Sequence, residues 1–156
     1  MIILISLLCV VLSFIAVRRF PSLAPLLFAG WLIVLAYSAF LSRVPTYSTK
    51  IILDPFRALE LFWKYHNVQA MWKYQYLEGI GLNILLFIPC GFLLPILSKR
   101  VSGWREMLIF GFLLSLTIEV LQRITLLGSF DVADLINNTI GSLMGWYLLK
   151  LGEELH

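Results

Sequence analysis

Five long apolar segments constrain this chain more than any other feature. A helix needs about 20 mostly apolar residues to cross the hydrocarbon core of a bilayer. The chain carries segments of about that length at residues 1–17, 25–42, 80–97, 104–124 and 131–150. Hydrophobic residues make up 60% of the sequence and charged residues 13%, whereas soluble domains carry about 25% charged residues. We therefore predict an all-α membrane protein: residues 1–156 form a single integral membrane domain, a compact bundle of about five transmembrane helices.

Residues 43–79 form the one long polar segment, between the second and third spans. Asp54 is placed to cap a helix that begins at Pro55, and apolar residues recur at helical spacing from Phe56. The segment is rich in Trp and Tyr, which favour the headgroup level of a membrane. This pattern predicts an amphipathic helix that lies in the membrane interface. The alternative is a lid or a ligand-contacting arm, which would include Arg57.

Several function classes find no support in the sequence. The 12 Lys and Arg residues form no long basic run, so we expect no nucleic-acid partner. Cys9 and Cys90 lie in apolar runs without the Cys or His spacing of a metal site, so we expect no metal and no cofactor. Arg18 and Arg19 follow the first apolar segment rather than precede it, which favours a retained helix over a cleaved signal peptide.

Polar residues are concentrated between Ser115 and Gly145, at the facing ends of two apolar segments. An ionisable group in a membrane helix costs roughly 2.5–3.5 kcal/mol on insertion scales, so such groups must be paired, hydrated or functional. Positions 115, 119 and 122 share one helix face, as do positions 131, 134 and 138. The short turn at Gly128-Ser129 makes the two helices antiparallel neighbours, so we expect their polar faces to meet. The polar residues are Glu119, Gln122, Arg123, Asp131, Asp134, Asn137 and Asn138.

Some of these residues have structural explanations. Arg123 lies four residues after Glu119 and is spaced to pair with it. Asp131 falls in the first turn of the fifth span, where a carboxylate interacts well with free N–H groups. That explanation does not extend to Asp134 and Asn138. Glu119, Asp131 and Asp134 are candidates for an acid/base pair, although no nucleophile is evident beside them.

Membrane topology brings a further residue to the same place. Asn83 lies near the start of the third span, on the same side as the end of the fourth span and the start of the fifth. The first and third loops are short and basic, and no basic residue precedes the first span. Both features favour an N-terminus outside the cell and a C-terminus in the cytoplasm. The polar residues and the aromatic segment then converge at the outer face, where we predict a polar pocket.

The fifth span also carries a GxxxG pattern at Gly141 and Gly145. This pattern permits two helices to approach closely. It favours packing within one subunit, and a homodimer through the two glycines is the alternative.

Three segments resemble the VanZ-like family of bacterial membrane proteins. They are NILLFIPCGFLLP at 83–95, SLTIEVLQ at 115–122 and FDVADLINNTIGSLMG at 130–145, and LDPFR at 53–57 is similar to an element that often precedes the third span in that family. The resemblance covers about residues 53–147. The chain departs from the pattern at Gly128, where members often carry an Arg. By motif position, the family's characteristic residues would be Asn83, Pro89, Gly91, Glu119, Gln122, Asp131, Asp134 and Asn138.

The resemblance implies a small multi-pass protein of the bacterial cytoplasmic membrane. The family's namesake is associated with resistance to teicoplanin, a lipoglycopeptide that binds cell-wall precursors outside the cell.

Three functions are compatible with these features. We predict a non-enzymatic protein whose outward pocket engages a lipoglycopeptide or a lipid-linked cell-wall precursor, and which lowers susceptibility to the drug. An intramembrane enzyme acting on a lipid-linked substrate and a transporter of lipids or small molecules are the alternatives. Membrane lipids are expected partners in each case. The predicted substrate-binding residues are Asn83, Glu119, Gln122, Arg123, Asp131, Asp134, Asn138 and Arg57.

Overall fold

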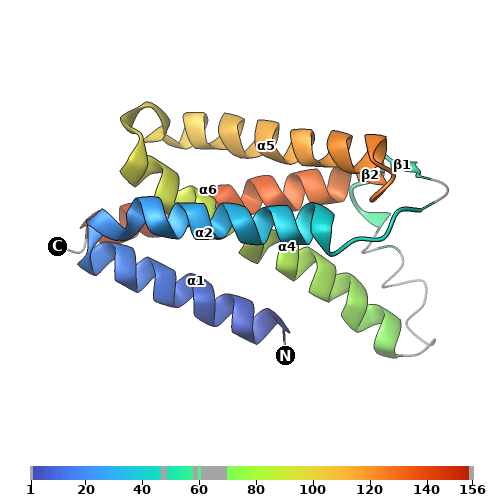
Figure 1. The fold of residues 1–156 in the computed structure, drawn as a ribbon, viewed down its shortest axis with the longest axis horizontal. Coiled ribbons are helices and arrows are strands. Elements are labelled where there is room, and N and C mark those ends of the chain that lie inside the picture. Colours follow the sequence, from blue (N-terminus) through green and yellow to red (C-terminus); the bar gives the residue numbers. More distant parts are fainter. Residues whose placement is uncertain (1, 47–48, 58–59, 61–69, 155–156) are drawn as a thin grey trace.

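The computed structural model describes residues 2–46, 49–57, 60 and 70–154 (Figure 1). Five α-helices make up most of this part: α1 (Ile2–Arg19), α2 (Ala24–Ala36), α4 (Ala70–Leu97), α5 (Trp104–Ile124) and α6 (Val132–Glu154). The 3-10 turn η1 (Pro21–Leu23) leads into α2, the π-helical turn η2 (Tyr37–Leu41) continues it, and the 3-10 turn η3 (Lys99–Val101) precedes α5. Two short strands, β1 (Ile51–Ile52) and β2 (Phe130–Asp131), pair in parallel. The all-α prediction is confirmed, with this strand pair as an addition.

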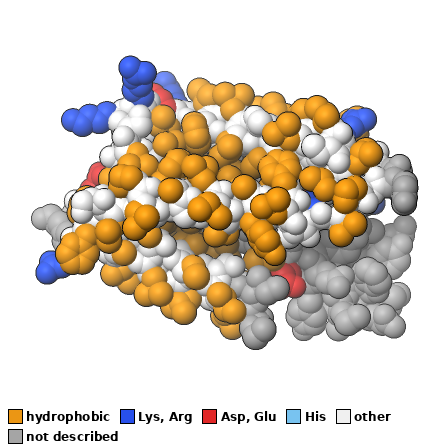
Figure 2. Space-filling view, viewed as in Figure 1, with side chains coloured by type: hydrophobic (Ala, Val, Ile, Leu, Met, Phe, Trp, Pro, Cys, Tyr) orange, Lys and Arg blue, Asp and Glu red, His pale blue; other side chains and the backbone are white. Residues whose placement is uncertain are grey.

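Three helical segments in the described part of the chain are long and apolar enough to cross a membrane. They are Pro21–Leu41, Leu77–Leu97 and Trp104–Ile124, which correspond to the second, third and fourth predicted spans. Apolar side chains cover the face of the molecule shown in Figure 2, and Lys and Arg side chains lie near its ends. The protein is therefore a membrane protein. That α1 and α6 also cross the membrane stays a prediction, although the 23 residues of α6 span about 35 Å at 1.5 Å per residue.

Helix α6 lies in the middle of the bundle and packs closely against α4. A Cβ atom on Gly145 would meet the backbone carbonyl of Ile88, and one on Gly141 would meet that of Ile84. From the other side, a Cβ atom on Gly91 would meet the backbone of α6 at Ser142. The GxxxG pattern is thus filled by α4 of the same chain. A second copy would reach these glycines only by displacing α4, and the homodimer itself stays a prediction.

Helices α5 and α2 complete the bundle around this pair. A Cβ atom on Gly111 of α5 would lie 2.6 Å from the Ser142 hydroxyl of α6, so these helices also approach closely. Helix α2 crosses in front of α4 (Figure 1), and Trp31 Nε1 donates a hydrogen bond to the Leu86 carbonyl at 2.7 Å. Trp31, Phe87 and neighbouring side chains form one apolar cluster, and Phe92 anchors a second cluster that α1 joins.

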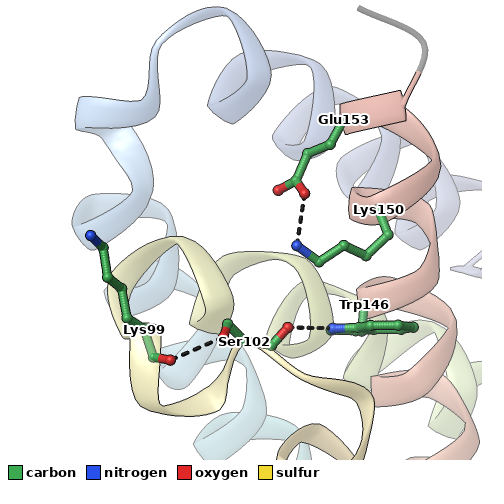
Figure 3. Close-up of polar contacts among 5 residues, drawn as sticks. All are labelled: Lys99, Ser102, Trp146, Lys150 and Glu153. Carbon is green, nitrogen blue, oxygen red and sulfur yellow. Dashed lines mark hydrogen bonds and ion pairs between the residues drawn. The ribbon is translucent and has the colours of Figure 1, made fainter.

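The end of the bundle at which α1 and α6 terminate is fixed by polar contacts (Figure 3). Trp146 Nε1 on α6 donates to the Ser102 carbonyl at 2.8 Å, and the Ser102 hydroxyl donates to the Lys99 carbonyl at 3.0 Å. Lys150 pairs with Glu153 at 2.7 Å, the one ion pair within the described residues. The bond from Trp146 to Ser102 ties the loop between α4 and α5 to α6.

The segment predicted as an interfacial loop, residues 43–79, differs at its second boundary. Helix α4 already begins at Ala70, so the helix of the third span extends into this segment. The predicted cap is present, because Asp54 Oδ1 accepts a hydrogen bond from the Phe56 N–H at 2.9 Å. Most of the predicted amphipathic helix falls on positions 58–59 and 61–69, which lie outside the described residues.

Candidate functional site

The turn between α5 and α6 brings the polar residues of the two helices together. Helix α5 ends in a Schellman motif, in which the Leu127 N–H donates to the Gln122 carbonyl at 2.8 Å and the Leu126 N–H to the Arg123 carbonyl at 3.2 Å. Leu126 takes the left-handed conformation, with φ 59°. The turn lies where the sequence predicted it, between Ile124 and Phe130. Its left-handed residue is Leu126, because no described glycine has a positive φ.

Glu119 and Asp131 are joined through the backbone at the start of α6. Glu119 is only 2% exposed, and its Oε2 accepts a hydrogen bond from the Asp131 N–H at 2.9 Å. Asp131 Oδ1 accepts one from the Ala133 N–H at 2.8 Å. Asp131 therefore caps α6, where a carboxylate offsets unpaired N–H groups and the positive end of the helix dipole. This capping role is the structural explanation that the sequence offered for Asp131.

Asp134 connects α6 to α4. Its Oδ1 accepts a hydrogen bond from Asn83 Nδ2 at 2.6 Å, and the pair is partly buried. A hydrogen bond to an ionised carboxylate is roughly twice as strong as one between neutral groups. The convergence of Asn83 with Glu119, Asp131 and Asp134, expected from topology, is therefore present at the α4–α6 interface.

Arg43 supplies the positive charge that lies near these carboxylates. It follows η2 and forms no ion pair with a described carboxylate, so its charge acts on Glu119 and Asp134 only over a longer range. Its Nε donates a long hydrogen bond to the Ser38 carbonyl at 3.4 Å. A Cβ atom on Gly128 would lie 2.9 Å from its terminal nitrogen. Sequence reasoning missed Arg43; the only available signal was a group of three acids with a single candidate cation, Arg123.

The cation that the sequence favoured, Arg123, does not pair with Glu119. No ion pair joins them in the described structure, and Glu119 bonds to the Asp131 N–H instead. Gln122 has a different role from Arg123. It is 3% exposed, and its Nε2 donates to the Ala39 carbonyl in η2 at 3.0 Å. Gln122 therefore attaches α5 to the end of α2.

A second polar layer lies one helical turn deeper in the bundle. Asn138 Nδ2 on α6 donates to the Ser115 hydroxyl on α5 at 2.9 Å, and both residues are buried. The Ser142 hydroxyl donates to the Asn138 carbonyl at 3.2 Å. The side-chain Oδ1 of Asn138 is buried and has no hydrogen-bond partner among the described residues. Asn138 thus joins α5 and α6 below the carboxylates rather than in contact with them.

Arg57 lies apart from these residues in its bonding. Its side chain is exposed and forms no hydrogen bond or ion pair with another described residue, and its backbone N–H donates to the Asp54 carbonyl at 3.5 Å. We use the name polar cluster for the residues that do gather at this end of the bundle: Arg43, Asn83, Glu119, Gln122, Asp131 and Asp134.

The polar cluster offers carboxylate acceptors, two amides and one guanidinium. Carboxylates at such a site can accept hydrogen bonds from hydroxyl, amide or ammonium groups, and they can act as a general acid or base. Among the described residues, no group of three or more His, Cys, Asp or Glu side chains is arranged to hold a metal ion.

The fold and this site define an α-helical membrane protein with a carboxylate–amide cluster at one end of its bundle. Residues 22–153 match the VanZ/LLP1 family. The chain belongs to that family, which confirms the resemblance seen in the sequence.

One relative is a curated protein of Enterococcus faecium. Protein VanZ of that organism is 38% identical over 72 residues, which cover 46% of this chain and 44% of that protein. The match thus spans less than half the length of the relative. No solved structure matches the chain significantly.

Proposed function

We propose that this protein lowers susceptibility to lipoglycopeptide antibiotics such as teicoplanin. In this proposal the polar cluster faces the outside of a bacterial cytoplasmic membrane and engages the drug or a lipid-linked cell-wall precursor. Membership of the VanZ/LLP1 family supports the proposal. The observation that carries it is the hydrogen bond from Asn83 to Asp134, because it draws α4 and α6 together next to Glu119 and Asp131.

The chemistry of the ligand class fits this arrangement. Lipoglycopeptides carry sugar hydroxyl groups and amide N–H groups, which are donors for carboxylate oxygens. Asp134 and Asn83 are only partly buried, so a ligand that approaches the end of the bundle can reach them. A lipid tail would pack against the exposed apolar faces of the helices, which include Leu26 and Ile33 of α2.

Expression in a susceptible bacterium tests the proposed function. We expect the minimum inhibitory concentration of teicoplanin to rise relative to cells with an empty vector. The rise for vancomycin, which has no lipid tail, should be smaller. An unchanged value for teicoplanin, with the protein present in the membrane, would show that resistance is not its activity.

An intramembrane enzyme that acts on a lipid-linked substrate is a second candidate. The observation that favours it is that Glu119 accepts the Asp131 N–H and Asp131 caps α6 three residues before Asp134, so three carboxylates lie at one helix end. Two nearby carboxylates can divide the roles of general acid and general base. Incubation of the purified protein with a lipid-linked precursor, followed by mass spectrometry, tests this candidate. A product that disappears in Glu119→Gln supports catalysis, and an unaltered precursor with the wild-type protein argues against it.

A further inference from the structure

The carboxylates of the polar cluster need a positive charge near them. Glu119 is almost fully buried. It accepts the Asp131 N–H at the start of α6, whose first turn also carries Asp134, so the three carboxylates lie at one helix end. Repulsion between like charges is strong where water is excluded. Neither Arg123 nor Arg43 forms an ion pair with a described residue, but Arg43 lies over the α5–α6 turn, with a terminal nitrogen 2.9 Å from where a Cβ atom on Gly128 would stand.

The position of Arg43 is fixed by the residues before it. Gln122 of α5 binds the Ala39 carbonyl in η2, so the end of the second span lies against the end of the fourth. Residue 43 comes two positions after η2 ends at Leu41. The main chain therefore leaves η2 beside the turn between α5 and α6.

The residues after Arg43 hold it in place. We call residues 43–46 and 49–52 the strap. The Thr46 N–H donates to the Leu126 carbonyl at 2.8 Å, and the Lys50 N–H donates to the Ser129 hydroxyl at 3.1 Å. The strap then pairs with the turn as β1 and β2, with Ile51 opposite Phe130. These bonds hold the strap against the α5–α6 turn both before and after positions 47–48, which lie outside the described residues.

Gly128 leaves room for the guanidinium. A Cβ atom there would lie 2.9 Å from the Arg43 terminal nitrogen and 3.4 Å from Gln122. Because Gly128 does not have a positive φ, its small size matters here rather than its backbone freedom. Any larger residue at this position would compete with Arg43 for the same space.

We infer that Arg43 is a positioning residue of the polar cluster, held over the α5–α6 turn by the strap and given room by Gly128. Its guanidinium offsets the repulsion between the Glu119 and Asp134 carboxylates. The inference deepens the proposed function and rests on it only where resistance is the readout.

A double-mutant cycle on the purified protein in detergent tests the coupling without any drug. Arg43→Gln should lower the melting temperature by about 2–4 °C, the shift typical of a contact of ordinary strength in a chain of this size. Arg43→Lys should retain most of the stability because it retains the charge. The loss caused by Arg43→Gln should be smaller when Asp134 is already Asn. Arg105→Gln, a matched charge removal at the first turn of α5, should have little effect.

Two results would overturn the inference. One is a loss for Arg43→Gln that is equal in the wild-type and Asp134→Asn proteins, since that would show no coupling. The other is a loss for Arg43→Lys as large as that for Arg43→Gln, since only the shape of Arg43 would then matter.

Moving the charge provides a further test with a functional readout. In an Arg43→Ala protein, the substitution Gly128→Arg supplies a guanidinium from the α5–α6 turn to the space that the Arg43 side chain has left. We expect it to restore the resistance and melting temperature that Arg43→Ala loses, whereas Gly128→Leu in the same background should not. Equal behaviour of the Arg and Leu variants would contradict the inference. Absence of resistance in the wild-type protein would instead contradict the proposed function. The double-mutant cycle, which is read from melting temperatures, would still decide the role of Arg43.

Discussion

At the scale of single residues, the polar cluster uses backbone groups and amides to accommodate its carboxylates. Glu119 binds the N–H of Asp131, and Asp134 binds the side chain of Asn83. A buried charge without such partners would be strongly destabilising. The deeper Asn138 is different, because its Oδ1 has no partner in the described part of the chain. The residues nearest the end of the bundle are thus the ones with charge, and the deeper ones are neutral.

Leu126 is a residue at which the backbone is strained. A non-glycine residue in the left-handed region costs roughly 1–2 kcal/mol, and the position after a helix C-cap usually carries glycine for that reason. We expect Leu126→Gly to raise the free energy of unfolding by up to about 1 kcal/mol, because glycine relieves this strain. The gain is limited because glycine also increases the conformational entropy of the unfolded chain. Thermal unfolding in detergent measures the effect. Leu127→Gly is the control, and it should be destabilising because Leu127 does not have a positive φ. Equal effects of the two changes would argue against the strain.

At the scale of secondary-structure elements, the α4–α6 interface is the structural base of the site. It holds Asn83 opposite Asp134, and its glycines allow the two backbones to meet. Gly145→Ala should lower the free energy of unfolding by about 1–3 kcal/mol, because the added methyl group overpacks the contact with Ile88. Gly30→Ala in α2 is a matched control, since a Cβ atom there would meet nothing within 4 Å. Chemical or thermal unfolding compares the two, and a similar change in both would contradict the assigned interface.

The sequence predicted the helices well because long apolar segments dictate them directly. The meeting of Asn83 with Asp134 could also be predicted, since short turns determine which helix ends lie together. Helix α4 begins at Ala70, whereas its apolar, membrane-length part covers Leu77–Leu97, close to the predicted span at 80–97. Arg43 and the β1–β2 pair could not be predicted. Two-residue strands have no periodicity, and nothing in the sequence indicates which turn a loop will cover.

At the scale of the whole molecule, charged residues of both signs lie at both ends of the bundle, with Lys50 and Arg123 near the α5–α6 turn and Glu106 and Glu153 at the other end. Acidic residues gather with Arg43 at the α5–α6 turn. The other end holds the helix termini and short loops with Arg18, Arg19, Lys99 and Arg105. Loops rich in Lys and Arg are typical of the cytoplasmic side. That the polar cluster faces outward stays a prediction.

Cysteine labelling in intact cells measures that orientation. In a Cys9→Ser background, Ser129→Cys at the α5–α6 turn should react with a membrane-impermeant maleimide before lysis. Ser102→Cys at the opposite end should react only after lysis. The reverse pattern would place the polar cluster in the cytoplasm and contradict an outward site.

The central claim is that the carboxylates of the polar cluster have a function beyond joining helices. The most direct measurement is the minimum inhibitory concentration of teicoplanin for cells that express wild-type protein, Asp134→Asn or Arg105→Gln at equal abundance in the membrane. Asp134→Asn keeps the shape of the side chain and an oxygen that can accept the hydrogen bond from Asn83, so the fold should persist. We predict that it loses the protection to the level of an empty vector, while Arg105→Gln retains it. Full protection by Asp134→Asn would contradict the claim and assign this carboxylate a purely structural role.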